Sequence, residues 1–374
     1  MPTVVTFGEI MLRLSTPGFQ RFAQAHTFDA TFGGGEANVA VSLAHFGHDA
    51  RFVCKLPTHA IGQAAVNRLR QYGVDTRFVV RGGERVGIYF LETGASQRPS
   101  TVVYDRAHSA VSQMDAAEVD WKAAFATEAG ATEAGATEAG GAEAGATEAG
   151  GADWFHWTGI TPALGPKPRA AVEAACRAAK AAGATVSCDL NFRSKLWTPD
   201  EAQAVMRPLM EHVDVCIANE EDADRSLGVR TEGSGADAAE AGALDVDGYA
   251  RLAETLQADF GFAAVAITLR ESHSASDNGW SAMLLGGAGA AQPLAEAVRS
   301  RVYDVRLVDR VGGGDSFAAG LIHGLLTKAD AEAALNFAVA ASALKQTIPG
   351  DLNLTTAGEV ETLAGGSGSG RVER

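Results

Sequence analysis

The chain has 374 residues, 46% of them hydrophobic, and carries 31 Lys and Arg against 46 Asp and Glu, a formal net charge of −15. This length is enough for one large α/β domain or two smaller ones with a sizeable core. The acidic balance argues against a general nucleic-acid or membrane-surface binder, which needs a basic face. It permits an anionic small substrate, because a few arginines in a cleft outweigh a distant acidic surface.

The N-terminal stretch MPTVVTFGEIML has no basic segment, and Glu9 interrupts its apolar run. It is therefore expected to form a first strand rather than a signal peptide. The longest apolar stretch, FGFAAVAITL, is too short to span a bilayer. The cysteines are Cys54, Cys176, Cys188 and Cys216. They show no CxxC spacing, so we expect a reduced, cytoplasmic protein that meets no membrane.

Short strand patterns alternate with Ala-rich helical patterns along most of the chain. Strands are expected at residues 4–7, 51–54, 153–158, 185–190, 213–218 and 262–269. Helical patterns such as 168–182 and 200–211 lie between them. This alternation predicts βαβ units and an α/β fold with a mainly parallel sheet.

Two strand patterns early in the chain break the alternation. VGIYFLE (86–92) and STVVYDR (100–106) predict a hairpin, because a Gly/Ser/Pro-rich turn separates them. With residues 10–33 they are expected to form a small β-sheet over the main sheet. The lid segments are therefore 10–33 and 85–106.

Residues 126–150 repeat ATEAG with small variations. A glycine every fifth residue costs a helix about 1 kcal/mol each, and a period of five keeps no face apolar. We interpret 126–152 as a solvated low-complexity insertion, with a partner-binding segment as the alternative. Residues 231–247 are expected to form a second surface loop. The resulting domain covers 1–365, and 366–374 form a flexible tail.

The stretch DRVGGGDSF (309–317) lies between a β-branched run and an apolar helical run. A glycine-rich turn that opens a helix exposes backbone N–H groups, so Gly312, Gly313 and Gly314 are predicted to cradle a phosphate or an oxyanion. Asp315 follows at the helix N-terminus, where it can take a proton from a hydroxyl. The combination favours phosphoryl transfer to an alcohol. The alternative is a tight turn with Asp315 as a helix cap.

A second glycine cluster opens TFGGGEANVAVSLAHFG (31–47), which predicts a helix that stops near Gly47. The backbone at Gly33 to Gly35 can approach a polyhydroxylated ligand closely. No GxxxxGK[ST] phosphate loop occurs in the sequence.

These two glycine clusters, in this order and near the two ends of the chain, resemble the two signatures of the ribokinase-like (PfkB) carbohydrate kinases. CDLNFRSKLW (188–197) and ANEED (218–222) are also similar to segments of that family. GEIMLRL, YDRAHSA, NFRSKLW and LRESHSASDNGWSA look most like its 2-keto-3-deoxygluconate kinases. The resemblance implies a doubly wound sheet flanked by helices, a β-sheet lid and ATP-dependent 6-phosphorylation of that sugar acid.

The resemblance also implies residue roles. Asp315 is expected to be the catalytic base, and Gly312, Gly313 and Gly314 the anion hole. The sugar acid would contact Gly34, Tyr89, Tyr104, Arg106, Arg193 and Asp351. The nucleotide side would include Asn219, Arg270 and Asn336. ATP and Mg²⁺ are the implied cofactors.

The sequence departs from the family pattern at two positions. The usual NxxE motif is here Asn219-Glu220-Glu221-Asp222, which puts in doubt the role of Asp222 in organising Mg²⁺. Glu220, Glu221 and Asp222 all remain candidates to hold the ion, through water. Arg310, directly after Asp309, is unusual for the wider family.

Other interpretations stay open at this stage. Arg106 and Arg193 can be ordinary ion-pair residues, and Tyr89 can be a sheet-packing residue. A kinase of a neutral sugar such as fructose, or a non-catalytic sugar-binding homologue, are the alternative functions. A lid sheet with free edges favours a homodimer formed through the lid.

Overall fold

The computed structural model describes residues 1–127, 150–231 and 246–367. Within them a ten-stranded sheet has the order β13-β12-β11-β10-β9-β8-β1-β4-β5, and β14 pairs with β12. Its strands are β1 (Thr3–Phe7), β4 (Asp49–Leu56), β5 (Val79–Arg81), β8 (Trp154–Thr158), β9 (Thr185–Asp189), β10 (Val215–Ala218), β11 (Ala264–Ser272), β12 (Asp277–Gly286), β13 (Leu294–Arg299) and β14 (Tyr303–Arg306). In this spatial order, all neighbouring strands from β11 through β1 to β5 pair in parallel.

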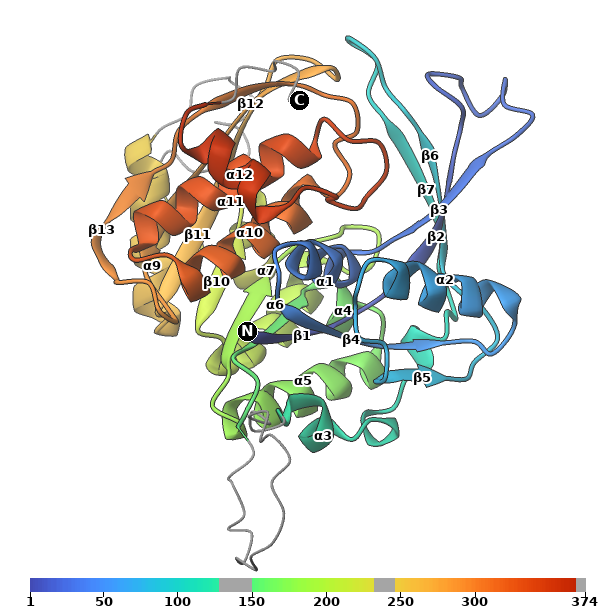
Figure 1. Cartoon of the computed structure of the whole chain (residues 1–374), viewed down its shortest axis with the longest axis horizontal. Coiled ribbons are helices and arrows are strands. Elements are labelled where there is room, and N and C mark those ends of the chain that lie inside the picture. Colours follow the sequence, from blue (N-terminus) through green and yellow to red (C-terminus); the bar gives the residue numbers. More distant parts are fainter. Residues whose placement is uncertain (128–149, 232–245, 368–374) are drawn as a thin grey trace, which may run out of the picture.

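Helices cover both faces of this sheet (Figure 1). They are α1 (Gly35–His45), α2 (Ala60–Gln71), α3 (Trp121–Phe125), α4 (Ile160–Ala163), α5 (Pro166–Ala181), α6 (Pro199–Leu209), α7 (Glu220–Leu227), α9 (Val246–Phe260), α10 (Gly313–Thr327), α11 (Ala331–Lys345) and α12 (Ala357–Ala364). Short 3₁₀ turns occur at Val111–Gln113, Ala116–Glu118 and Met210–His212.

The predicted alternation of strands and helices is confirmed. Each predicted strand is present, with ends that differ by a few residues; the one expected at 51–54 extends over Asp49–Leu56. The helical patterns at 168–182 and 200–211 correspond to α5 and α6. Local signals set these boundaries: Thr198 and Glu201 form a reciprocal capping box at the start of α6.

The sequence patterns did not predict the antiparallel edge of the sheet. β12 pairs antiparallel with β11 along its whole length, and with β13 and β14 on its other side. Nearly all of β12 is buried, so its sequence lacks the in-out alternation that marks a half-exposed strand. Its place between β11 and the outermost strands β13 and β14 is decided by tertiary packing.

A separate four-stranded sheet forms the lid, in the order β3-β2-β6-β7. Its strands are β2 (Met11–Ser15), β3 (Asp29–Gly33), β6 (Ile88–Glu92) and β7 (Thr101–Asp105). The predicted hairpin is confirmed, because β6 and β7 pair antiparallel. β2 pairs with β6 in parallel and thereby joins the two lid segments. In Figure 1 this sheet extends to the upper right, away from the main sheet.

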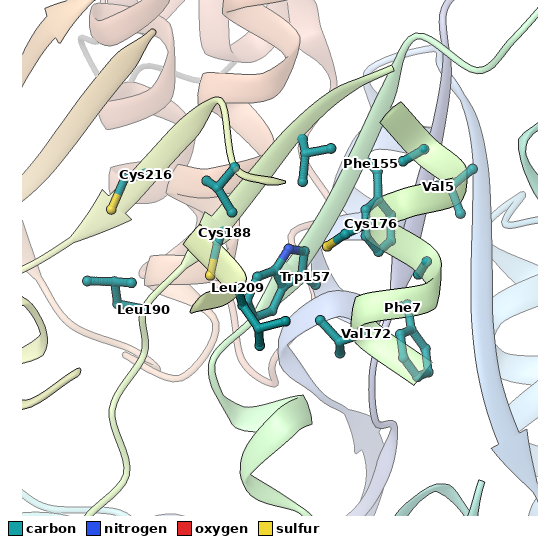
Figure 2. Close-up of a cluster of buried hydrophobic side chains, with 14 of the residues drawn as sticks. Val5, Phe7, Phe155, Trp157, Val172, Cys176, Cys188, Leu190, Leu209 and Cys216 are labelled. Atoms are coloured by element: carbon teal, nitrogen blue, oxygen red, sulfur yellow. The ribbon is translucent and has the colours of Figure 1, made fainter. Parts of the chain in front are cut away.

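Two apolar layers enclose the main sheet. Because neighbouring side chains on a strand point to opposite faces, Trp154 and Phe155 enter different layers. Phe155 packs in the layer shown in Figure 2, beside Trp157 of the same strand and Cys176 of α5. The opposite layer contains α10 and α11, which pack closely because a Cβ at Gly320 would lie 2.7 Å from the Cα of Ala338.

The described residues test only part of the remaining predictions. Most of the predicted insertion (128–149), most of the loop (232–245) and most of the tail (368–374) lie outside them. The four cysteines are buried and unpaired. In the described segments, no helix has the length and apolar character needed to cross a membrane.

Candidate active site

A cleft of about 860 Å³ lies where the carboxyl ends of the parallel strands face the lid. This edge of a parallel sheet is the usual place for ligands in open α/β folds. All but one of the predicted site residues line the cleft. They are Gly34, Tyr89, Tyr104, Arg106, Arg193, Asn219, Glu220, Asp222, Arg270, Gly312, Gly313, Gly314, Asp315 and Asp351.

The glycine turn has the geometry expected of an anion site. Gly312 precedes the first turn of α10 with φ at 81°, in the left-handed region that favours glycine. A Cβ at Gly312 would also lie 2.0 Å from the backbone oxygen of Asp351, so no other residue fits. Gly314 faces open space within the cleft. The first helical turn therefore offers its N–H groups to a phosphate, except that of Gly313, which donates to the backbone oxygen of Arg310 at 3.2 Å.

Asp315 is not a helix cap. No side-chain cap bond is present at the start of α10, and the Asp315 carboxylate instead accepts a hydrogen bond from Nδ2 of Asn38 at 2.6 Å. Burial raises the pKa of Asp315 to about 6, although the bond from Asn38 opposes the shift. The carboxylate is thus mostly ionised at neutral pH and has a proton affinity suited to a general base.

Asn38 is a site residue that sequence reasoning did not single out. It belongs to α1, where its Oδ1 accepts a hydrogen bond from the N–H of Gly34 at 3.2 Å while its Nδ2 donates to Asp315. One amide therefore connects the first glycine cluster to the second. The only available signal was the asparagine of GGGEAN, which by itself is equally compatible with a surface position on the helix.

Glu36, from the same helix, is a buried carboxyl group that links α1 to the residues at the end of β8. Its Oε1 accepts hydrogen bonds from the hydroxyls of Thr158 and Thr161 at 2.8 and 2.6 Å. A Cβ at Gly8 would lie 2.0 Å from this carboxyl group, so Gly8 makes room for it. Burial raises the pKa of Glu36 to about 7. The contacts hold the end of β8 beside α1.

The lid contributes two tyrosines to the cleft. The rings of Tyr89 and Tyr104 lie 6.0 Å apart between centroids. Tyr89 is buried, and its hydroxyl donates a hydrogen bond to Asp351. The face of β6 that carries Tyr89 is therefore turned into the cleft. Asp351 receives a second bond on its other oxygen, from Nη1 of Arg13 at 2.5 Å.

The two arginines predicted to bind the sugar acid differ in their surroundings. Arg106 pairs with Glu9, to which its Nε donates at 2.9 Å and its Nη2 also donates. Arg193 donates from Nη1 to the backbone oxygen of Phe192 at 2.9 Å, and within the described part of the chain it forms no salt bridge, although its charge opposes the raised pKa of Asp222. Both line the cleft, but Arg193 has more of its guanidinium free for an anion.

Of the three residues predicted on the nucleotide side, two line the cleft and one does not. Arg270 is exposed in the cleft. Asn219 lines it too, although its Oδ1 accepts a hydrogen bond from the N–H of Asp222 as the N-cap of α7. Asn336 does not line the cleft, because its Oδ1 accepts a hydrogen bond from the N–H of Arg301 at 3.1 Å. The structure therefore does not bring Asn336 together with the others.

An acidic wall lines the cleft near Asp315. It contains Asp189, Glu220, Glu221 and Asp222. Burial raises the pKa of Asp222 to about 6, and burial followed by the charges of Asp222 and Asp315 raises that of Asp189. Across residues 1–127, 150–231 and 246–367, no three acidic, His or Cys side chains are grouped to hold a metal by themselves. Mg²⁺ keeps waters and uses one or two carboxylates plus phosphates, so these donors fit an ion that arrives with a phosphate ligand.

The fold and the site together define a class of enzyme. An α/β sheet, a β-sheet lid, a helix N-terminal anion site and a carboxylate base between them are typical of a phosphotransferase with an alcohol acceptor. The pfkB carbohydrate kinase family matches residues 1–133 and 286–356, more than half of the chain. The chain belongs to the pfkB family of carbohydrate kinases, and its predicted ribokinase-like fold is confirmed.

Relatives within the family narrow the comparison. The chain is similar to the 2-dehydro-3-deoxygluconokinase of Thermotoga maritima, whose crystal structure has a TM-score of 0.85 at 47% identity and covers 98% of this chain and 100% of its own. It is 32% identical to the 2-dehydro-3-deoxygalactonokinase of Haloferax volcanii, over 98% of each chain. It is 26% identical to the 2-dehydro-3-deoxygluconokinase of Bacillus subtilis, over 93% of this chain and 91% of that one.

Proposed function

We propose that the protein transfers the terminal phosphate of ATP to the 6-hydroxyl of 2-keto-3-deoxygluconate (2-dehydro-3-deoxygluconate), giving 2-keto-3-deoxy-6-phosphogluconate. The observation that carries the proposal is the position of Asp315. It lies beside the glycine turn, in a cleft that is also lined by Tyr89, Tyr104 and Arg106 of the lid and by Arg193. The names of the relatives at 47% and 32% identity support a keto-deoxy sugar acid as the acceptor.

The chemistry follows from the placement of these groups. Asp315 takes the proton of the 6-hydroxyl, and Asn38 holds its carboxylate toward the cleft. The N–H groups after Gly312 stabilise the charge on the transferred phosphoryl group. Arg193 binds the sugar carboxylate, because a guanidinium donates two parallel hydrogen bonds to such a group. Tyr89 and Tyr104 cover the sugar.

Mg²⁺ belongs to this proposal as a cofactor. Glu220 and Asp222, both in the acidic wall, would hold the ion, in part through water. When bound, Mg²⁺ supplies positive charge that offsets the charge of the phosphates. Arg270 lies on the same side of the cleft and would contact the nucleotide.

A substrate panel tests the proposal. ATP turnover would be measured with 2-keto-3-deoxygluconate, 2-keto-3-deoxygalactonate, gluconate and fructose, with phosphate position assigned by NMR. We expect the highest kcat/KM with a keto-deoxy sugar acid and a 6-phosphate product. Equal or better turnover of fructose would favour a neutral-sugar kinase. Binding of sugar without any phosphate transfer would favour a non-catalytic homologue.

A further inference from the structure

We infer that Arg13 is a positioning residue of this kinase, which ties the lid to the glycine turn through two aspartates. Arg13 belongs to lid strand β2 and is 4% exposed. Its Nη1 donates to Asp351 and its Nη2 donates to Asp309, each at 2.5 Å. Its Nε donates to Ser15 at 2.6 Å, so all three nitrogens are engaged. One guanidinium therefore joins three segments that are far apart in the sequence.

The first aspartate shapes the anion site. Asp309 accepts hydrogen bonds from the N–H of Val311 and the N–H of Gly350, both at 3.0 Å. Its backbone oxygen accepts a third from Nζ of Lys345, a fully buried ammonium. These contacts fix the turn that leads directly into Gly312. The Arg13 bond adds a fixed attachment of this turn to the lid.

The second aspartate, Asp351, lies between Gly33 at the end of lid strand β3 and the anion site at Gly312. A Cβ at Gly33 would lie 2.1 Å from Oδ2 of Asp351, and a Cβ at Gly312 would lie 2.0 Å from its backbone oxygen. Tyr89 donates to the same carboxylate. Any shift of Asp351 therefore moves Tyr89 on the sugar side and Gly312 on the phosphate side together.

The charges in this cluster balance. Arg13 and Lys345 oppose Asp309 and Asp351, all four of them on largely buried side chains. A buried carboxylate that loses its only close guanidinium is strongly destabilised. Arg13 therefore holds both aspartates in place with a single side chain, which a lysine cannot do because its point charge bonds well to only one of them.

The matched variants are Arg13→Lys, Asp309→Asn and Arg98→Lys. Arg98 lies in the lid and pairs with Glu92 at 2.9 Å. Among the residues that the structure describes it makes no hydrogen bond to the glycine turn, so it reports on lid ion pairs in general. We expect Arg13→Lys and Asp309→Asn each to lower kcat by about 10- to 100-fold, because small misplacements of reacting groups are costly. Arg98→Lys is expected to keep turnover within about twofold.

A double-mutant cycle separates positioning from simple stability. If Arg13 acts through Asp309, the double variant loses little more than the worse single variant, whereas independent roles multiply the two losses. Melting temperatures measured in parallel correct for unfolded protein. Multiplied losses, or an Arg13→Lys variant with normal kcat and a lower melting temperature, would overturn the inference and leave Arg13 structural.

The kcat measurements rest on the proposed function, because they need the proposed substrate. A second measurement, which needs no sugar, is therefore included. Hydrogen exchange of the ligand-free protein would follow the amides of β2 and β6. Asp309→Asn, although it lies outside the lid, is expected to speed their exchange at least severalfold, as does Arg13→Lys. Unchanged hydrogen exchange of the lid amides in both variants would show that Arg13 does not connect the lid to the glycine turn. A wild type that is inactive on every sugar acid would reject the proposed function alone.

Discussion

At the residue scale, the proposed reaction depends most on Asp315. Asp315→Asn keeps the shape and removes the base, so we expect kcat to fall by about 10²- to 10⁴-fold with substrate affinity largely retained. Steady-state kinetics would measure this, with Asp304→Asn on the exposed part of β14 as the control. A variant that keeps more than about a third of wild-type kcat would show that Asp315 is not the base.

The pH dependence of the wild-type enzyme follows from the same carboxyl. The base must be ionised, and burial raises its pKa to about 6. We therefore expect kcat/KM to be constant above this value and to fall as the pH drops through it, about tenfold for each further pH unit. A profile that stays flat down to the ordinary aspartate range would contradict the assignment.

We also expect single residues to decide the choice of substrate. Arg193→Lys keeps the positive charge but loses the two parallel N–H donors of the guanidinium. We therefore expect KM for the sugar acid to rise roughly tenfold, about 1.4 kcal/mol, with little change in KM for ATP. Arg177→Lys, on the outer face of α5, is the control because its exposed pair with Glu173 lies outside the cleft.

Arg106→Lys tests sugar binding less directly than Arg193→Lys does. Its guanidinium already pairs with the buried Glu9, so a change in KM there would combine sugar binding with the loss of that ion pair. Normal binding of the acid by both lysine variants would make both arginines structural.

At the element scale, the repeat insertion is flanked by an ordered pairing. Thr127 donates from its N–H to the oxygen of Gly150 at 2.8 Å, and Ala152 donates to that of Phe125 at 2.7 Å. The two ends therefore lie side by side and can be joined by a short turn. We expect removal of 128–149, with two glycines in its place, to leave turnover intact and to lower the melting temperature by less than about 5 °C. Calorimetry of both proteins would reveal a larger drop if the repeat packs against the core.

At the scale of the whole molecule, the lid remains the proposed dimer interface. Its edge strands β3 and β7 pair on one side each, and β7 is mostly exposed, with Val103 at 48%. Free strand edges with apolar side chains favour pairing with a second copy. We expect a dimer by light scattering and a shift toward monomer for Val103→Glu. A monomeric wild type would remove this proposal.

The sequence by itself determined the features that depend on neighbouring residues. A strand, a glycine turn and a helix start are specified within a few positions, so the parallel strands, the lid hairpin and the turn that presents Asp315 were all predicted. The joint order of two such motifs was enough to indicate the family.

Only the tertiary structure decided which distant side chains meet. Asn38 and Asp315 are 277 positions apart, and Arg13 and Asp351 are 338 apart. Nothing local in the chain marks such partners, because the contact exists only after the sheet and the lid have packed. For the same reason Arg106 turned out to face Glu9, 97 positions away, and Asn336 turned out to lie outside the cleft. Local chemistry fixed the catalytic turn, and long-range packing decided how its charges are held.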